Sequence, residues 1–332
     1  MKMKILAVRV GRVGDTVMMT PALTALLQYY PDAEITLLLS PAGKALLKDF
    51  HPNIKHIWTW QRSGILRPIK DKKNILKNLA STHFDKIICF DTSPRIGSLF
   101  TGLDTDLQQF RWPKTLIHCA RAYLEFVAEI SDKPAIDTYN YLPVREDASK
   151  QLAAELSEHG ITSDDKILMI HPTFSGYSPY GIRKREAKLR KLWSPENYGR
   201  LIDKIAGSTD QKIRTVIMLL PDEFPFGRKI LDNSNSDILL LKSESTFERY
   251  KAMIQRANVI LTPDSGPMHV ASALGTKIVA FFSMKDPGDC GPYMAPDKFI
   301  ILRSEDMPQP EKGINAIDVK TVYDAVMRLF AR

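Results

Sequence analysis

The sequence is poor in cysteine and has no long apolar run. Its 332 residues include only three cysteines, Cys89, Cys119 and Cys290, which lie far apart in the chain. They form neither a CxxC pair nor a disulfide framework, so a cysteine-based metal site and a disulfide-stabilised scaffold are excluded. We therefore expect a reducing, cytoplasmic environment. No apolar stretch approaches the roughly 18 residues that span a bilayer, so a transmembrane helix is not expected.

Signals of other protein classes are also missing. The first apolar run, KILAVRV at residues 4–10, is followed too soon by Gly11 and Asp15 to be a signal peptide. The glycines that follow it do not spell GxGxxG, so a dinucleotide-binding fingerprint is not supported. There is no short-period repeat and no low-complexity tract. The length and ordinary composition predict a globular protein of one or two domains.

Acidic residues are outnumbered by basic ones. The chain has 46 lysines and arginines against 38 aspartates and glutamates, a formal net charge of +8. A basic protein of this kind indicates an anionic partner, which is a nucleic acid, an acidic lipid surface or a phosphorylated substrate. A basic surface that is simply solvated is equally compatible with the charge alone.

Apolar runs alternate with helical patterns along the whole chain. The runs are continuous rather than alternating, which is typical of strands buried on both faces of a parallel sheet. The expected strands are 4–10, 34–40, 55–60, 86–91, 166–173, 214–220, 237–242, 257–264, 277–283 and 299–304. This rhythm predicts an α/β protein with two Rossmann-like domains, 1–155 and 156–332, whose parallel sheets face each other across a cleft. The last helix, near 318–330, could pack back on the first domain.

Three turns carry residues suited to chemistry, and the first is GRVGDTVMMTPAL at residues 11–23. Gly11 and Gly14 permit a tight turn and the close approach of another chain. Asp15 stands where a helix from about 15 to 30 is expected to begin. One interpretation is that Asp15 only caps that helix. The other is that its carboxylate is a general base at the carboxyl end of a strand, where it could take a proton from an attacking hydroxyl.

The second turn, residues 171–193, follows the first strand of the second domain and is strongly basic. Its basic side chains are Arg183, Lys184, Arg185, Lys188, Arg190 and Lys191. Ser194 and Pro195 then open a helix as N-cap and first residue. A lysine just before a helix N-terminus suits a phosphate, because its ammonium group and free N–H groups can converge there. A mobile basic loop is the alternative for most of 174–190, and closure of that loop over substrate is a hypothesis.

The third turn, TPDSGPMHVASALGT at residues 262–276, joins an apolar strand to a helix. Asp264 ends the strand, Ser265 and Gly266 form the turn, and Pro267 fits the first helical position. The N–H groups of Gly266, Met268 and His269 at a helix N-terminus would make a natural anion site. His269 is equally compatible with a buried core histidine.

Taken together, the three turns resemble the ADP-heptose:lipopolysaccharide heptosyltransferases, glycosyltransferase family 9. The family pattern is a GD…TPAL turn near the N-terminus, a K-x-W before a helix and a late D-[ST]-G-x-x-H turn. Here these are GDTVMMTPAL, KLW and DSGPMH, in the same order over essentially the full length. The resemblance implies a GT-B fold with the acceptor on the first domain and the nucleotide-sugar on the second. It also implies an inverting transfer without an obligatory metal or other cofactor.

The resemblance assigns roles to residues at the matching positions. Asp15 is similar to the family's general base, and Lys191 to the lysine that binds the diphosphate and balances its growing charge. The residues of the donor turn are Asp264, Ser265, Gly266, Met268 and His269. Thr173 is similar to a further phosphate contact, and Glu223 to an acid that binds ribose hydroxyls. Asp104 and Asp106 match a DxD metal motif by letters alone, and we interpret them as surface residues.

The acceptor implied by the resemblance is an anionic lipopolysaccharide precursor, Kdo-lipid A. The expected acceptor-binding residues in the first domain are Gly14, Arg62, Arg67, Lys70 and Lys73, since arginine suits bidentate contact with carboxylates and phosphates. The segment 66–80, LRPIKDKKNILKNLA, mixes basic and apolar residues at helical spacing. It could rest on an anionic inner leaflet, which makes the expected location cytoplasmic and peripheral to the inner membrane. An ordinary surface helix with an apolar core face is the alternative.

Three competing functions remain open at this point. The same fold could use another nucleotide-sugar or another glycan, because a phosphate-binding turn does not specify the sugar. A hydrolysing nucleotide-sugar epimerase would share the two-domain plan, but it would need extra acids and no acceptor surface. A non-catalytic nucleic-acid-binding protein would use Tyr177 and Tyr180 beside the basic run IRKREAKLRK. That last function leaves the two αβ halves unexplained, so no nucleic-acid partner is expected.

Overall fold

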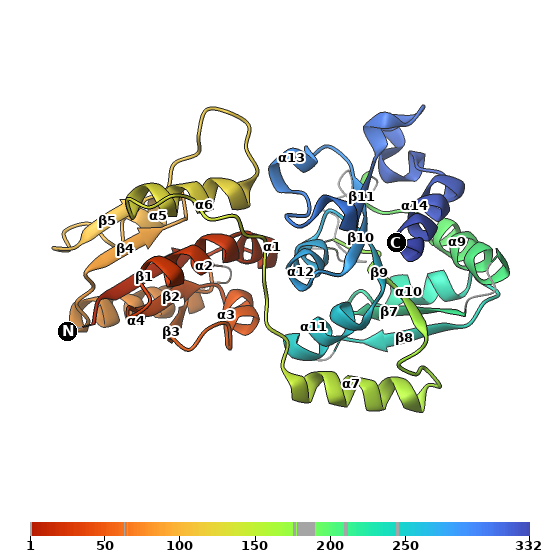
Figure 1. Ribbon diagram of the computed structural model, residues 1–332, viewed down its shortest axis with the longest axis horizontal. Helices are drawn as coiled ribbons and strands as arrows, with labels where there is room; N and C mark the ends of the chain where they lie inside the picture. The colour runs from red at the N-terminus through yellow and green to blue at the C-terminus, as the bar shows by residue number, and fades with distance from the viewer. Residues whose placement is uncertain are drawn as a thin grey trace. The chain divides into compact units, whose positions relative to one another are not determined.

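The computed structural model describes residues 2–62, 64, 66–174, 177, 190–208, 212–243 and 246–332. The chain divides into two compact units, Met1–Pro143 and Val144–Arg332. Each unit is built on its own parallel sheet with helices on both faces, as Figure 1 shows unit by unit. Among the described residues, no helix is long and apolar enough to cross a membrane.

The first unit contains a five-stranded sheet in the order β3-β2-β1-β4-β5. Its strands are β1 (Lys4–Arg9), β2 (Glu34–Leu39), β3 (Ile54–Thr59), β4 (Lys86–Cys89) and β5 (Asp106–Gln109). All neighbouring strands pair in parallel. The first four strands were expected from their apolar runs. Strand β5 was not, because it is polar and lies at the edge of the sheet, where Asp106 is exposed and pairs with Lys86 at 2.6 Å.

Helices cover both faces of this sheet. They are α1 (Val13–Met18), α2 (Thr20–Tyr29), α3 (Pro41–Leu47), α4 (Arg67–Ser81), α5 (Pro94–Gly97) and α6 (Cys119–Ile130). On one face, Cys89 of β4 packs in a core with Ile75 of α4 and Ile96 of α5. The next residue, Phe90, points to the opposite face and contacts the ring of Tyr123 on α6. The single helix expected over 15–30 is two helices, because the chain breaks at Met19.

The second unit contains a six-stranded sheet in the order β11-β10-β9-β6-β7-β8. Its strands are β6 (Lys166–Ile170), β7 (Ile213–Leu219), β8 (Ile238–Lys242), β9 (Val259–Pro263), β10 (Lys277–Phe282) and β11 (Phe299–Arg303). Its helices are α7 (Glu146–Glu158), α9 (Pro195–Ser208), α10 (Phe224–Leu231), α11 (Phe247–Arg256), α12 (Gly266–Leu274), α13 (Pro287–Cys290) and α14 (Val319–Ala331). All six strands were predicted from the sequence, and the continuous burial along β9 shows why their apolar runs are unbroken.

Both sheets have the strand order of a Rossmann fold. Counted within each unit, the orders are 3-2-1-4-5 and 3-2-1-4-5-6. The order reverses between β1 and β4 in the first unit and between β6 and β9 in the second. Ligands of such sheets bind at the carboxyl ends of the strands on either side of this reversal. The first and third turns singled out in the sequence follow β1 and β9, so each lies at one of these two points.

The division between the units differs from the expected boundary of 155/156. It falls between Pro143 and Val144, so the whole of α7 belongs to the second unit. The reason is that α7 packs on α11, where Arg249 pairs with Glu155. The last helix, α14, packs on α9 and on strands β9 to β11 of its own unit. Leu329 of this helix is buried in the core of the second unit. That the helix also packs back on the first domain stays a prediction.

Candidate active site

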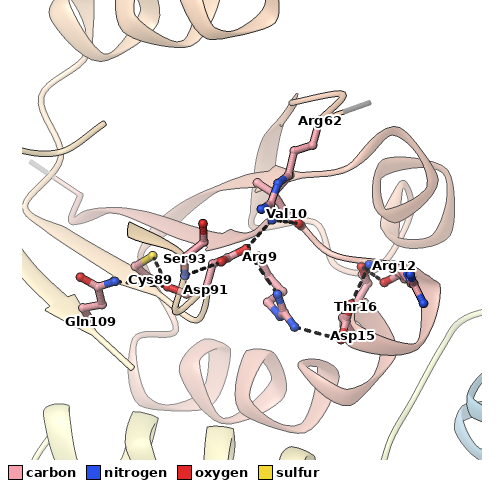
Figure 2. Close-up of polar contacts among 10 residues, drawn as sticks. All are labelled: Arg9, Val10, Arg12, Asp15, Thr16, Arg62, Cys89, Asp91, Ser93 and Gln109. Carbon is pink, nitrogen blue, oxygen red and sulfur yellow. Dashed lines mark hydrogen bonds and ion pairs between the residues drawn. The ribbon is translucent and has the colours of Figure 1, made fainter. Parts of the chain in front are cut away.

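Asp15 lies in the first turn of α1, directly beyond the carboxyl end of β1. The helix begins at Val13 with Arg12 as its N-cap, so Asp15 is the third helical residue rather than the N-cap that one interpretation predicted. Its Oδ2 reaches back to accept a hydrogen bond from the backbone N–H of Arg12 at 2.8 Å, which caps the helix in a different way. Its Oδ1 pairs with the guanidinium of Arg9 at 2.9 Å (Figure 2). The side chain is 30% exposed. Capping therefore leaves the carboxylate oriented and open to solvent, as a general base requires.

Gly11 is needed for this arrangement because Asp15 folds back against it. A Cβ atom at position 11 would lie 2.6 Å from the Cβ of Asp15 and 2.7 Å from its Oδ2. Real Cβ atoms do not approach other atoms so closely, so any larger residue must displace the carboxylate. Gly14, predicted to be near the acceptor, is buried within α1.

A second carboxylate, Asp91, follows strand β4 on the other side of the reversal point. Its side chain is only 4% exposed. Its Oδ2 lies 3.4 Å from Arg9 and 3.5 Å from Arg62, and its Oδ1 accepts the backbone N–H of Ser93 at 2.9 Å (Figure 2). Arg9 therefore bridges Asp15 and Asp91, and this set of Arg9, Asp15, Arg62 and Asp91 is called the charged cluster below.

Arg9 is held as a fixed cation inside the charged cluster. Burial works to lower the pKa of its guanidinium, but the electrostatic effects of Tyr123, Asp15 and Asp91 outweigh burial, and the pKa is raised. Its guanidinium carbon also lies 6.0 Å from the centre of the Tyr123 ring. Arg62 is different, since its side chain is 45% exposed and donates to the carbonyl of Val10 at 3.2 Å. It is the cation of the cluster that an incoming anion can reach.

The other predicted acceptor residues lie elsewhere in the first unit. Arg67, Lys70 and Lys73 are on α4 and are exposed to solvent. No ion pair between described residues joins them to the charged cluster. Of the predicted acceptor residues, only Arg62 is therefore linked to Asp15 by ion pairs among the described residues, through Asp91 and Arg9. The basic residues of α4 do not take part in these ion pairs.

The predicted donor turn lies at the reversal point of the second sheet. Asp264 follows β9, and Ser265 is the N-cap of α12, with its Oγ 3.0 Å from the Oγ1 of Thr262. The N–H groups of the first helical turn, here those of Gly266 and Met268, have no partner within a helix and can meet an anion. The side chains of Met268 and His269 are buried, so Met268 can offer only its backbone.

Lys191 is positioned beside this turn. Its Nζ lies 2.9 Å from Oδ2 of Asp264, and the two side chains are 22% and 15% exposed. The anchor is Trp193, two residues further on, which is fully buried and donates its indole N–H to the carbonyl of Ile317 at 2.9 Å. Two residues predicted separately from distant motifs therefore form one ion pair next to the N-terminus of α12.

Thr173 and Glu223 also meet, although they were predicted independently. The hydroxyl of Thr173 donates to Oε1 of Glu223 at 2.7 Å, and the backbone N–H of Leu220 donates to Oε2 at 3.0 Å. Both residues are buried, so each reaches a ligand only if this contact rearranges. The same hydroxyl lies 3.2 Å from Nε2 of His171, whose Nδ1 lies 3.1 Å from the hydroxyl of Tyr250.

Burial controls the charge of this hydrogen-bonded group. Desolvation lowers the pKa of His171 below its ordinary value, although Glu223 and a backbone hydrogen bond act in the opposite direction. The imidazole is therefore neutral near pH 7. Desolvation likewise raises the pKa of Tyr250, so its hydroxyl keeps its proton. His171 and Tyr250 are thus neutral, buried supports for Thr173 and Glu223 beneath the carboxyl end of β6.

The segment after β10 carries a thiol, Cys290, whose pKa is affected by the Lys191–Asp264 pair. Burial raises the pKa of the Cys290 thiol on α13 to about 11, and Asp264 raises it further while Lys285 and Lys191 lower it. These effects place α13 in the electrostatic environment of the donor turn. Met284 has a positive φ of 69°, an unusual conformation for a residue with a side chain. Its N–H donates to Glu305 at 2.8 Å, which holds the segment in place.

Most of the basic loop expected to close over substrate lies outside the described residues. Of the segment 174–190, the structure describes residues 174, 177 and 190. The glycines of the loop, Gly176 and Gly181, and Tyr180 of the nucleic-acid hypothesis lie outside that part. Lid closure stays a hypothesis.

A protein-family model for "Glycosyltransferase family 9 (heptosyltransferase)" matches residues 87–316, more than half of the chain. The chain belongs to this family. The resemblance drawn from the three turns is thereby confirmed, and the chain is a glycosyltransferase. The hypothesis of a non-catalytic nucleic-acid-binding protein, which was based on the basic charge, is wrong because the chain is a member of an enzyme family.

Curated proteins similar to this family 9 member include lipopolysaccharide heptosyltransferase 3 of Escherichia coli K12. That protein is 23% identical over 298 residues, which cover 82% of this chain and 80% of the relative. Lipopolysaccharide core heptosyltransferase OpsX of Haemophilus influenzae is 22% identical over 314 residues, covering 90% of this chain and 84% of the relative.

Solved structures of family 9 proteins share the fold over nearly the whole chain. A glycosyltransferase family 9 protein from Veillonella parvula superposes with a TM-score of 0.83 at 19% identity, covering 99% of this chain and 98% of that one. ADP-heptose lipopolysaccharide heptosyltransferase II of E. coli gives a TM-score of 0.77 at 19% identity, covering 99% of both chains. The pair of Rossmann-like units is thus that of the GT-B fold, as expected.

Sequence reasoning missed Arg9, Asp91, His171 and Tyr250 in this glycosyltransferase. Arg9 and Asp91 carried a usable signal, because each is a charged residue at the end of an apolar run that reads as a buried parallel strand. His171 stands in the same position after β6. Tyr250 carried no such signal, since it comes from the middle of α11 and meets His171 only in the folded chain.

Proposed function

We propose that the chain is an inverting heptosyltransferase that moves heptose from ADP-heptose to the Kdo-lipid A inner core of lipopolysaccharide. The observation that carries the proposal is the pairing of Lys191 with Asp264 beside the free N-terminus of α12. This places a cation and backbone N–H groups at the reversal point of a Rossmann sheet, where a nucleotide diphosphate binds. Family membership supplies the transfer reaction.

Related structures support ADP-heptose as the donor. The E. coli heptosyltransferase WaaC has been solved with ADP and with ADP-2-deoxy-2-fluoro heptose. Those chains superpose with TM-scores of 0.74 and 0.71 at 15% and 14% identity. The curated relatives act on lipopolysaccharide by name. Their fold is shared with this chain, and the donor and acceptor are carried over as a proposal.

In the proposed reaction, Asp15 takes the proton from the acceptor hydroxyl as that oxygen attacks the anomeric carbon. The bond from the anomeric carbon to the diphosphate oxygen breaks at the same time, and ADP leaves with the negative charge. Attack from the face opposite the diphosphate inverts the anomeric configuration. Lys191 and the N–H groups of Gly266 and Met268 stabilise the charge that grows on the departing diphosphate.

The remaining predicted residues have supporting roles in this proposal. Asp264 orients Lys191 until the diphosphate arrives. Ser265 fixes the start of α12, and His269 packs beneath it. Thr173 is proposed to contact the phosphates and Glu223 the ribose hydroxyls, once the hydrogen bond between them rearranges. Arg62, which is half exposed and held weakly at 3.5 Å from Asp91, is free to pair with a carboxylate or phosphate of the acceptor.

The proposal is tested by incubating the purified chain with ADP-heptose and Kdo-lipid A and following heptosylated lipid by mass spectrometry. Matched reactions contain ADP-mannose or UDP- and GDP-sugars. The proposal predicts product with ADP-heptose and little with the other donors. Product with another nucleotide-sugar, or only with another glycan acceptor, would reject the named substrates but keep the glycosyltransferase. The separate alternative of an epimerase predicts a changed sugar without any acceptor.

A further inference from the structure

Helix α4 presents apolar side chains on two sides. Ile75 and Leu79 face inward and are buried in the core of the first unit. Leu66, at the N-cap, is 79% exposed, Ile69 is 68% exposed and Leu76 is 44% exposed. The sequence pattern allowed a surface helix whose apolar residues all form the core face. The structure shows instead that three of its five large apolar residues are unused by the fold.

The exposed apolar residues form one stripe. At 100° per residue, positions 66, 69 and 76 fall within about 80° of one another around the helix axis. Lys73 lies within the arc that these three residues span around the helix. Lys70 and Lys77 lie just outside one edge of this arc, and Lys72 lies outside the other edge. The outer stripe of α4, defined by Leu66, Ile69 and Leu76, is thus enclosed by ammonium groups.

The basic residues of α4 are not neutralised by neighbours. The helix carries five, which are Arg67, Lys70, Lys72, Lys73 and Lys77. Its single acid, Asp71, accepts the backbone N–H of Gln61 at 2.8 Å. None of the five cations forms an ion pair with any residue that the structure describes. The helix therefore presents a net positive charge of about four beside an apolar surface.

The stripe is also rigidly held. The indole N–H of Trp60 donates to the carbonyl of Pro68 at 3.1 Å, and Asp71, the fifth residue of α4, accepts the backbone N–H of Gln61. Together with the buried Ile75 and Leu79, these contacts fix the rotation of α4 about its own axis. The exposed leucines cannot turn inward without breaking the core.

We propose that the outer stripe of α4 docks the protein on an anionic lipid bilayer. The lysines would lie at the level of the headgroups, and Leu66, Ile69 and Leu76 would enter the boundary with the acyl chains. A nucleic acid would use the charge but not the apolar stripe, and a second copy of this chain would bring the same positive charge against it. This inference rests on the proposed function, because the proposed acceptor is a lipid that lies in a bilayer.

The test is co-sedimentation of the purified full chain with vesicles, in the absence of donor and acceptor. Vesicles of phosphatidylcholine with phosphatidylglycerol are compared with vesicles of phosphatidylcholine alone. We expect binding to the anionic vesicles that weakens as salt is added. The triple variant Leu66→Ser, Ile69→Ser, Leu76→Ser and the double variant Lys72→Glu, Lys77→Glu should each bind at least about tenfold more weakly.

Matched controls carry the same chemical changes elsewhere. Leu107→Ser alters an exposed leucine on β5, and the double variant Lys229→Glu, Lys312→Glu reverses two exposed lysines of the second unit. Both controls should bind as the wild type does. All variants should keep the wild-type melting temperature, and the two α4 variants should transfer sugar normally to an acceptor dissolved in detergent.

Equal binding by the wild type and the α4 variants would overturn the proposal, as would equal binding to neutral and anionic vesicles. Dimerisation in solution that the triple variant abolishes would assign the stripe to a second copy instead, and so would also overturn it. Because vesicle binding is measured without substrates, its loss is distinguishable from a failure of the proposed transfer reaction, which the detergent assay reports separately.

Discussion

Replacing Arg9 by Met removes the cation that joins Asp15 to Asp91 while keeping most of the side chain's volume. Asp91 is nearly buried and would keep only Arg62 at 3.5 Å and the N–H of Ser93 at 2.9 Å. Breaking a buried ion pair costs about 3–5 kcal/mol. Since Asp91 retains these two partners, we expect a smaller loss than this, about 2–3 kcal/mol of unfolding free energy. For a protein of this size that is a fall in Tm of about 4–12 °C.

The same substitution should slow catalysis by releasing Asp15. That carboxylate would keep only its bond from the Arg12 N–H at 2.8 Å. A misplacement of about 1 Å costs up to about 10²-fold in rate, so we expect kcat to fall roughly 10- to 100-fold. The KM for the nucleotide-sugar should not change, because the donor residues belong to the other unit. Asp15→Asn, which removes the base itself, should cost about 10²–10⁴-fold.

A double variant separates stability from catalysis. Asp91→Asn in the Arg9→Met background removes the poorly paired buried charge, so it should restore part of the melting temperature. It should not restore kcat, because Asp15 still lacks its cation. Arg9→Lys, which keeps the charge, should retain more activity than Arg9→Met. Wild-type kcat in Arg9→Met, or full recovery of kcat in the double variant, would refute the view that Arg9 positions Asp15.

Four further outcomes are expected. Lys191→Gln should weaken ADP binding, measured by calorimetry, about 10- to 100-fold, because a hydrogen bond to a charged group contributes about 1.5–3 kcal/mol. Lys191→Arg keeps the charge and should weaken binding less. Equal ADP affinity in the wild type and both variants would contradict the role assigned to Lys191. Gly11→Ala should lower kcat while leaving ADP binding intact, because the new Cβ displaces Asp15; unchanged kcat would show that the contact is relieved harmlessly. Burial lowers the pKa of His171 below 6.5, so the unfolded chain binds a proton that the folded chain does not. The contribution of His171 to the free energy of unfolding should therefore be fully present above pH 6.5 and fall by up to about 1.4 kcal/mol per pH unit below it. Urea unfolding at several pH values should show a smaller dependence on pH in His171→Gln than in the wild type. Treatment with EDTA should leave transfer unchanged, and activity that returns only with added Mg²⁺ would overturn the metal-independent mechanism.

The parallel strands were predictable because a strand that is buried on both faces of a sheet has an unbroken run of apolar residues. Strand β9 is buried along its whole length, and its run ANVILTP is correspondingly apolar. Edge strand β5, DLQQ, needs no such composition and was missed. The boundary between the units was misplaced because it depends on the packing of α7 against α11. That packing joins residues about a hundred positions apart, and no local pattern records it.

The candidate site was predictable where a residue type and a turn coincide. Asp15, Asp264 and Lys191 each stand at a strand end or a helix start, so their positions followed from the elements around them. The Lys191–Asp264 pair could not be foreseen, because it depends on the anchoring of Trp193 in a core assembled from several distant elements. Arg9 and Asp91 were passed over since neither belongs to a motif, and only the neighbouring positions of β1 and β4 bring them together.

The most direct test of the central claim is the single-turnover rate of heptose transfer from ADP-heptose to Kdo-lipid A, measured for the wild type and for Asp15→Asn. The account predicts an inverted product from the wild type, a rate lower by about 10²–10⁴-fold in Asp15→Asn, and equal ADP affinity in the two proteins. An equal rate in both proteins would contradict the account, because Asp15 would then be only the cap of α1.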